Sequence, residues 1–589
     1  MKLTVSLGCV FLLVTSPLQA VPHLHPELYP NAKPCHPKQI TPDMIKRFGS
    51  ARAAVISTAL GTKNIAVILV QFPSAGSSTN GPSNGAIQSV DTFDSYFASM
   101  AAYYHEVSFG KMTLHFSFFG TSTGASPTGS ISAHAAGGGF PMPNPMEYYG
   151  CGDVDPGCNG VSPVAPSGLG GAYLIHDGIV AARTATTGPT STASAGIFDA
   201  VLVMHAGYGN ETTAKNGDVW SAFYQEPTVI SANGTTFVDG ATFPELESST
   251  ITSPLGVMCH EFGHVLTLPD LYNTAVFGGS SVVGKWDLMD AGPYLGGGTN
   301  PAHMGAWDKT YLGWATPQAA PSRGSFSLSP IESISNPSGV IKMPVQSGGN
   351  QEYFLLEYRS KTAGSFDQYI PGTGLLIWHI DDAITSARGF AATDPSLQNK
   401  VNIGSPHNGI SIVTQDGLTI SNANQGQATN LFSNADNFTS PKSDNFSGVP
   451  SGVSVVKIAG VGSASATFEV VNLAVTAGQT IAKVINFPNP AGHGYPHPKG
   501  EGYTTLQFQL GRPATDPQIN IYTLSGDLVR KIDKNELTLN TDRSTDDKWV
   551  YEFDWDLKNG NGQHVAPGVY IYLVRADGQS KSTKAVVIR

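Results

Sequence analysis

The sequence predicts an α/β (α+β) domain followed by β-sandwich domains, and three observations support this fold class. Two apolar runs rich in β-branched residues, at 65–72 and 198–204, suit buried strands, and segments with helical spacing lie between them. From about residue 319 the helical spacing disappears, and short β segments alternate with clusters of turn residues. With 589 residues, 66 Gly and 40 Pro, the chain is long enough for several domains with many turns.

The first twenty residues have the features of a secretory signal peptide. Met1-Lys2 supplies a positive charge, residues 3–13 are apolar, and Ala20 is a small residue at the expected cleavage site. We therefore expect residues 1–20 to be removed and the mature protein to be secreted. No later stretch reaches about 18 consecutive apolar residues, so no membrane span is expected. The net charge of −11 argues against a nucleic-acid partner.

Strand and helix patterns alternate over residues 61–318. The expected elements are a central strand at 65–72, a helix at 91–107 capped by Asp91, a half-buried strand at 111–119, a helix at 173–183 and a strand at 198–204. Residues 120–170 are rich in Gly, Pro and Ser and are expected to form a long surface region. This order predicts a sheet with helices packed against it.

The motif His-Glu-Phe-Gly-His at 260–264 is expected on the next helix. A helix turns about 100° per residue, so His260 and His264 lie on one face and can bind one metal ion, with Glu261 beside it. A proline then ends the helix, so the chain is expected to turn and to bring Asp270 back as an oxygen ligand. Three protein ligands and a water make a catalytic zinc site. The alternative is a chance match on a structural helix, against which the third candidate ligand argues.

Three further features surround this motif. Met289, on a turn at 284–292, can form an apolar floor beneath the histidines; the alternative is ordinary core filling. A second helix is expected at 301–312, ending at Gly313. His205 stands at a strand end and is expected to be structural, with metal binding as the alternative.

Four cysteines remain after the expected signal peptide. A local bridge between Cys151 and Cys158 is the first choice, which leaves Cys35 and Cys259 either to pair or to stay free. Cys259 is expected to be buried. Residues 21–60 are expected to be a pro-segment that covers the site until it is removed. In the zymogen Cys35 could supply a thiolate to zinc, and a disulfide or an idle thiol are the alternatives.

Residues 319–472 are expected to form a β-sandwich, because short strands separated by turns replace the helices. Asp381-Asp382 and the run 422–448 offer oxygen ligands for a structural Ca²⁺ ion, but solvated loops are the favoured interpretation. Residues 480–589 show evenly spaced strands with Gly turns, which predicts a second, smaller sandwich.

Residues 61–460 resemble the immune inhibitor A-like secreted metallopeptidases. The segments that carry the resemblance are 65–72, 103–111, 260–272, 286–289, 312–314, 353–359 and 374–379. The resemblance implies a zinc endopeptidase with a metzincin-like (zincin) catalytic domain, made as a zymogen. It also implies that His260, His264 and Asp270 bind zinc and that Glu261 is the catalytic acid/base.

The sequence departs from metzincin-like motifs at Thr267, three residues after the second histidine, where these motifs usually have a glycine at the turn. A side chain disfavours a left-handed backbone by about 1–2 kcal/mol, so we expect the turn before Asp270 to take another form. The C-terminal residues 480–589 look like an Ig-like secretion or surface-sorting module of exported bacterial proteins. This resemblance implies contact with a cell surface or with secretion machinery.

The sequence therefore predicts a secreted zinc-dependent endopeptidase that acts on extracellular proteins through a zinc-bound water activated by Glu261. Tyr294, five residues after Met289, could assist at the oxyanion, or it could be a packing residue. The alternative function is a catalytically inactive zincin scaffold that serves as a surface adhesion or binding protein. All the catalytic residue types are present, which favours the enzyme.

Overall fold

The computed structural model describes residues 58–588 with internal gaps. The gaps are 74–89, 121–137, 154–164, 166–169, 185–197, 214–216, 225–239, 276–278, 321–322, 346–350, 390–396, 473–480, 512, 515–516, 542, 545–547 and 577–578. The expected signal peptide at 1–20, most of the expected pro-segment at 21–60, Cys35 and Cys158 lie outside the described residues.

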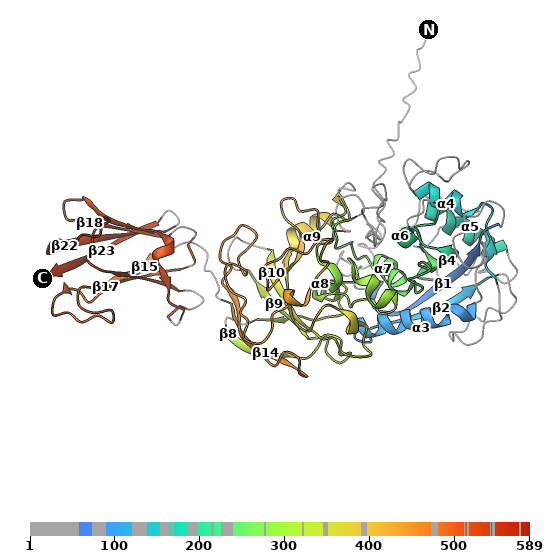
Figure 1. The fold of residues 1–589 in the computed structure, drawn as a ribbon, viewed down its shortest axis with the longest axis horizontal. Helices are drawn as coiled ribbons and strands as arrows, with labels where there is room; N and C mark the ends of the chain where they lie inside the picture. Colours follow the sequence, from blue (N-terminus) through green and yellow to red (C-terminus); the bar gives the residue numbers. More distant parts are fainter. Residues whose placement is uncertain are drawn as a thin grey trace, which may run out of the picture.

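Residues 58–316, here called the first region, form an α/β layer around a mostly parallel sheet (Figure 1). Its strands are β1 (Gly61–Gln71), β2 (Met112–Phe119), β3 (Phe140–Pro141), β4 (Ala200–Tyr208), β5 (Ala222–Tyr224) and β6 (Gly240–Leu246). Its α-helices are α3 (Val90–Val107), α4 (Met146–Asp153), α5 (Gly170–Thr184), α6 (Asn210–Thr213), α7 (Leu255–Val265) and α8 (Ala306–Tyr311). The strand order is β2-β1-β4-β6-β5, with β3 paired to β1 and with β5 as an antiparallel edge strand. The expected mixed α/β class is confirmed.

Residue patterns explain where each strand lies. Strand β4 and the part of β1 from Ile65 to Val70 are apolar and almost entirely buried, because helices cover both faces of the sheet. Strand β2 lies at the edge, and its alternating pattern directs one set of side chains inward, as expected. On one face Phe97 of α3 contacts Phe116 of β2. On the other face Gly178 of α5 lies against Val70 of β1.

Some elements differ from the sequence predictions. Helix α3 begins at Val90, one residue before the expected start at Asp91. Part of the expected surface region 120–170 forms α4. Strands β5 and β6 were not expected; Gly240 and Pro244 hide the strand pattern of β6, which tertiary pairing with β4 nevertheless forms.

The helix expected at 301–312 is also shorter, because α8 starts only at Ala306. Before it, the backbone N–H of His303 donates to Asp367 Oδ1 at 2.8 Å, and that of Gly305 donates to Asp287 Oδ2 at 2.7 Å. These carboxylates hold the chain in a non-helical path.

Residues 318–472, here called the second region, contain two sheets. The five-stranded sheet has the order β12-β11-β10-β9-β7, and the three-stranded sheet has the order β13-β14-β8. The strands are β7 (Gln318–Ala319), β8 (Arg323–Leu328), β9 (Val340–Pro344), β10 (Glu352–Arg359), β11 (Gly374–Asp381), β12 (Ile410–Val413), β13 (Val453–Ala459) and β14 (Ala466–Asn472), and helix α9 spans Asp382–Arg388.

The five-stranded sheet of the second region packs on both faces. One face, with Leu355 and Trp378, joins the hydrophobic core of the first region. The opposite face, with Leu356 and Ile377, shares a second core with the three-stranded sheet. The first core therefore runs across residue 318 without a break.

Residues 481–588, here called the C-terminal region, form two further sheets with the orders β15-β17-β21-β20 and β16-β23-β22-β18-β19. The strands are β15 (Ile481–Phe487), β16 (Ala491–Gly492), β17 (Thr504–Leu510), β18 (Gln518–Thr523), β19 (Leu528–Ile532), β20 (Thr538–Leu539), β21 (Trp549–Trp555), β22 (Gly568–Ala576) and β23 (Gln579–Ile588). Figure 1 shows them together at one end of the molecule. Their buried cluster draws on residues of this region alone. Among the described residues, every helix is too short or too polar to cross a bilayer.

Candidate metal centre

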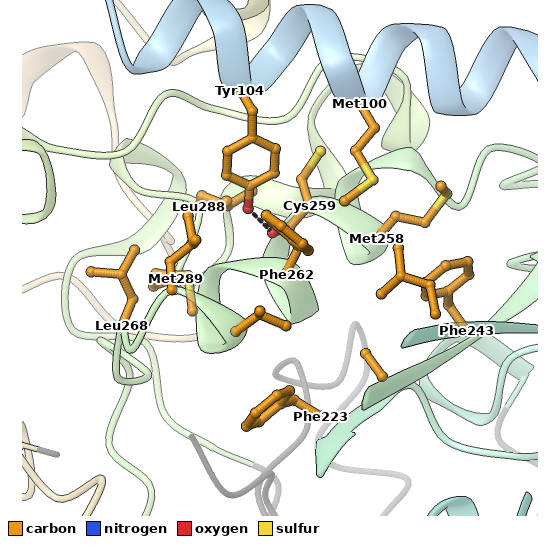
Figure 2. Close-up of a cluster of buried hydrophobic side chains, with 14 of the residues drawn as sticks. Met100, Tyr104, Phe223, Phe243, Met258, Cys259, Phe262, Leu268, Leu288 and Met289 are labelled. Carbon is orange, nitrogen blue, oxygen red and sulfur yellow. Dashed lines mark hydrogen bonds between the residues drawn. The ribbon is translucent and has the colours of Figure 1, made fainter. Parts of the chain in front are cut away.

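Helix α7 carries the histidine motif and lies in the centre of the first core. All its residues are buried, and it packs against β5 and β6 of the sheet and against α3. Figure 2 shows Met100 and Tyr104 of α3 on one side of α7, with the Tyr104 hydroxyl donating to the Cys259 carbonyl. Gly256 is required for close packing, since a Cβ there would meet the Pro293 carbonyl oxygen at 1.9 Å.

The turn after α7 is a Schellman motif with threonine at its left-handed position. The N–H of Leu268 donates to the Gly263 carbonyl at 3.0 Å, and the N–H of Thr267 donates to the His264 carbonyl at 2.9 Å. Thr267 has φ +80°, so the expectation that threonine would force another turn is wrong. Tertiary packing overrides the local preference, and Asp270 follows on the far side of the bend.

The two histidines of α7 are oriented by backbone carbonyls. His260 Nδ1 donates to Leu288 O at 2.9 Å, and His264 Nδ1 donates to Leu268 O at 2.8 Å. In the neutral imidazole each Nε2 then carries the lone pair that a metal ion would use, whereas in the protonated imidazole Nε2 donates toward Asp270. Both Nε2 atoms face Asp270 Oδ1, at 3.1 Å from His260 and 3.5 Å from His264.

The three side chains fit a zinc ion. One ligand atom each from His260, His264 and Asp270 can be chosen so that all lie within 4.8 Å of one another, and this is the one such cluster that the described residues contain. In a tetrahedral site with bonds of about 2.0–2.2 Å, ligand atoms lie about 3.3–3.6 Å apart, close to the separations from Asp270. Two imidazoles and one carboxylate are a donor set that zinc accepts.

Charges within the cluster shift the pKa values of its members. Burial alone would raise the pKa of Asp270, but the charge of His264 and hydrogen bonds from both histidines outweigh burial and lower it to about 2. Burial alone would lower the pKa of His264, but Asp270 and Glu261 raise it. The carboxylate of Glu261 is thus close enough to act on His264.

The chain from Asp287 to Asp290 packs against α7. Met289 is fully buried, and a Cβ on Gly263 would lie 2.7 Å from its Sδ, so the glycine lets the thioether rest on the helix (Figure 2). Asp287 Oδ1 accepts from the Met289 N–H at 2.7 Å, while Asp290 Oδ2 accepts three backbone N–H bonds at 2.8 Å. These carboxylates fix the loop whose Leu288 carbonyl orients His260.

Three acidic or phenolic groups lie close to Glu261. Burial raises the pKa of Glu211 to about 7, and burial together with Glu211 raises the pKa of Glu247 well above its usual value. The charge of Glu261 contributes to both shifts. Burial and these carboxylates also raise the pKa of Tyr294, so its phenol stays protonated at neutral pH. The sequence offered no spacing that could have identified Glu211 or Glu247.

Other candidates from the sequence take structural places. His205 is buried inside β4, which runs on to Tyr208, so it does not stand at a strand end as expected; its Nδ1 donates to the Ala206 carbonyl, and it lies outside the metal cluster. Cys259 is buried and free, which excludes its pairing with Cys35. Cys151 is disulfide-bonded.

The carboxylates considered for calcium have protein partners. Asp381 Oδ1 accepts from the Ala383 N–H at 2.8 Å, and its Oδ2 lies 3.0 Å from His407 Nε2. Asp382 accepts a hydrogen bond from the Tyr353 hydroxyl. Within the described ranges neither aspartate joins a group that could hold a metal ion.

Asn399 of the second region contacts the site and was also missed. It hydrogen-bonds both the backbone and the side chain of Asp270 from 129 positions along the chain. A long-range contact of one polar residue in a loop leaves no periodic or spaced signal in the sequence.

Comparison with known proteins finds a family match in the central part of the chain. Residues 187–316 match the family described as immune inhibitor A peptidase M6, catalytic domain. The pre-pro-metalloprotease PrtV of Vibrio cholerae serotype O1 (strain M66-2) is 30% identical over 129 residues, 20% of this chain and 14% of that protein. Immune inhibitor A of Bacillus thuringiensis subsp. alesti is 29% identical over 128 residues, 20% of this chain and 19% of that protein.

Among solved structures, the C-terminal domain of wzt matches with a TM-score of 0.14 and 16% identity, over 19% of this chain and 75% of that chain. A likeness at this TM-score supports no conclusion. The aligned segment of the curated relatives spans less than a fifth of their own lengths. The resemblance seen in the sequence is confirmed for the part of the chain that holds the site: residues 187–316 match the catalytic domain of the immune inhibitor A (M6) peptidases.

Proposed function

We propose that this chain is a secreted zinc-dependent endopeptidase, with His260, His264 and Asp270 as metal ligands and Glu261 as the acid/base. The observation that carries the proposal is the convergence of the three ligand atoms at a buried point, with each imidazole oriented by a carbonyl. The family match and the relative described as a metalloprotease support the reaction class.

The residues around the cluster suit hydrolysis of a peptide bond. When bound, a zinc ion supplies Lewis acidity toward water and toward a peptide carbonyl. Glu261 can take the proton from the attacking water and pass it to the leaving amine. The raised pKa of Tyr294 keeps its hydroxyl a hydrogen-bond donor at neutral pH, as either a packing role or an oxyanion role requires.

An edge strand beside the cluster suits an extended peptide substrate. Within the described residues β5 pairs on one side only, with β6. The ring of Phe223, in the middle of β5, lies 6.3 Å from the ring of His264. A peptide that adds to such an edge gains main-chain hydrogen bonds and passes close to the metal ligands.

We also propose the organisation expected from the sequence: a signal peptide at 1–20, a pro-segment at 21–60, a catalytic domain at 61–318, a β-sandwich at 319–472 and an Ig-like module at 480–589. The self-contained core of the C-terminal region supports its assignment as a separate sorting or surface module. N-terminal sequencing of the mature secreted protein would locate the cleavage sites.

The first test is the variant Glu261→Gln. It removes the proton acceptor and leaves the three ligands in place, so we expect zinc content to stay at the wild-type level while peptidase activity falls by about 10²–10⁴-fold. Activity is measured on processed protein with casein or a fluorogenic peptide, and zinc by elemental analysis. Glu536→Gln, which changes a carboxylate of the C-terminal region, is the matched control.

The outcomes separate the two functions. Chelator-sensitive proteolysis that zinc restores supports the enzyme. Near-normal turnover by Glu261→Gln would remove Glu261 from the mechanism. A processed wild-type protein that binds zinc and cleaves no protein would favour the alternative, an inactive zincin scaffold used for adhesion.

A further inference from the structure

A loop of the second region holds the chain segment that follows the metal helix. Asn399 Oδ1 accepts from the Asp270 N–H at 2.8 Å, and Asn399 Nδ2 donates to Asp270 Oδ2 at 2.7 Å. Three residues later, Asn402 Nδ2 donates to the Leu271 carbonyl at 2.7 Å. The two asparagines therefore grip neighbouring residues, but only Asn399 touches a candidate ligand.

The contact with Asn399 gives the two oxygens of Asp270 different tasks. Oδ2 accepts the amide N–H, while Oδ1 points to the two histidine Nε2 atoms. A carboxylate on an unrestrained side chain can rotate and exchange its two oxygens. Metal binding would then have to stop this rotation, at a cost in entropy. Asn399 binds the backbone and the carboxylate together, so the carboxylate is oriented before the metal arrives.

Asn399 is itself held firmly by its surroundings. It is 3% exposed and adopts φ +55°, a left-handed conformation that asparagine accepts more easily than most residues. Its carbonyl accepts from Thr274 Oγ1 at 2.8 Å. Nearby, Asn402 Oδ1 accepts from the Ile410 N–H at 2.9 Å, and Val401 lies in the core that the two regions share.

We infer that Asn399 is a positioning residue for the third metal ligand, so that the second region completes a metal centre whose ligands all belong to the first. This inference rests on the proposed function, because it takes Asp270 as a ligand. Partners that orient metal ligands typically contribute 10–100-fold to metal affinity. Metal binding and correct docking of the second region should therefore stabilise each other.

The experiment uses the full chain and the variant Asn399→Gly. Glycine accepts φ +55° and removes both hydrogen bonds, so the backbone is not strained. We expect the zinc dissociation constant, measured by competition with a chromophoric chelator, to rise by about 10–100-fold. Absorption spectra of the Co²⁺-substituted protein should also change, since they report ligand geometry.

Two further variants keep the test decisive. Asn402→Ala removes the neighbouring grip on Leu271 and should lower thermal stability while leaving zinc affinity within about twofold of wild type, a spread of about 0.4 kcal/mol. Asn399→Ser, whose side chain is too short to reach Asp270, should repeat the loss of zinc affinity if Asn399→Gly does not fold. Unfolding of the metal-free proteins separates loss of fold from loss of affinity.

Equal zinc affinity and equal Co²⁺ spectra in wild type, Asn399→Gly and Asn402→Ala would overturn the positioning role. Equal loss of affinity in both asparagine variants would also overturn it, because the loop would then act only through general packing. A wild-type protein that binds no zinc would instead contradict the proposed function. The two failures are therefore distinguishable.

Discussion

The two β-rich parts of the molecule are joined to the rest of the chain in different ways. The second region shares a hydrophobic core with the first region, and it contributes Asn399 to the candidate metal centre. The C-terminal region keeps a core of its own. Similar strand patterns in the sequence thus lead to different relations with the site. One β-rich region shares its core with the candidate metal centre, and the other has a separate core.

Ion pairs show the same contrast. Arg359 of the second region is fully buried and makes two hydrogen bonds to Asp367, at 2.7 and 2.8 Å, and one to the Trp286 carbonyl of the first region at 2.8 Å. Burial alone would raise the pKa of Asp367, but Arg359 outweighs it and lowers that pKa. In the C-terminal region Arg530 pairs with Asp556 at 2.9 Å while 23% of its side chain stays exposed.

The largest expected effect comes from shortening the chain at two points. A chain that ends at 316 loses the sheet that covers the first core, and we expect it to form no cooperatively folded protein. A chain that ends at 472 should keep its fold, because the missing part has its own core. Calorimetry and near-UV circular dichroism measure both.

Two outcomes would contradict these expectations. Cooperative unfolding of the chain that ends at 316 would show that the first region folds without the second. Collapse of the chain that ends at 472 would show that the C-terminal region is not independent.

A smaller effect is expected from Arg359→Met and its counterpart Arg530→Met. Removing Arg359 leaves Asp367 and Glu357 buried without their cation, which should cost about 3–5 kcal/mol of unfolding free energy. Removing Arg530 from a solvent-screened pair should cost about 1 kcal/mol or less. Denaturant titration of each variant, with the transition of each region followed separately, gives both values. Similar losses in the two variants would remove the electrostatic contrast between the regions.

The smallest change in unfolding free energy is expected at Thr267 of the first region. Thr267→Gly should relieve the left-handed strain and remove a buried hydroxyl that has no hydrogen-bond partner among the described residues, while adding chain entropy to the unfolded state. We expect a net gain of about 1 kcal/mol in unfolding free energy. Thr267→Ala, which removes the hydroxyl and the methyl group but keeps the Cβ that strains the left-handed backbone, is the control. A loss of stability in Thr267→Gly would show that the methyl contacts outweigh the strain.

How far the sequence predicted this molecule depends on the range of the interactions. The convergence of His260, His264 and Asp270 follows from helix geometry and one proline, which are local, and their spacing predicted it. The φ of Thr267 contradicts its local preference, so only the packed structure reveals it. Short strands such as β5 exist because a neighbouring strand pairs with them, and no pattern within three residues signals that. The hydrogen bond from Asn399 to Asp270 joins positions 129 residues apart, so no spacing rule in the sequence predicts it.

The thiol of Cys259 offers a way to measure the opening of α7. It is enclosed in the core, where burial raises its pKa, and it is the residue directly before His260. A thiol-reactive dye can reach Cys259 only in molecules in which α7 has opened away from the core. The labelling rate therefore measures how often α7 opens, and it does so at a native residue directly before the candidate ligand His260.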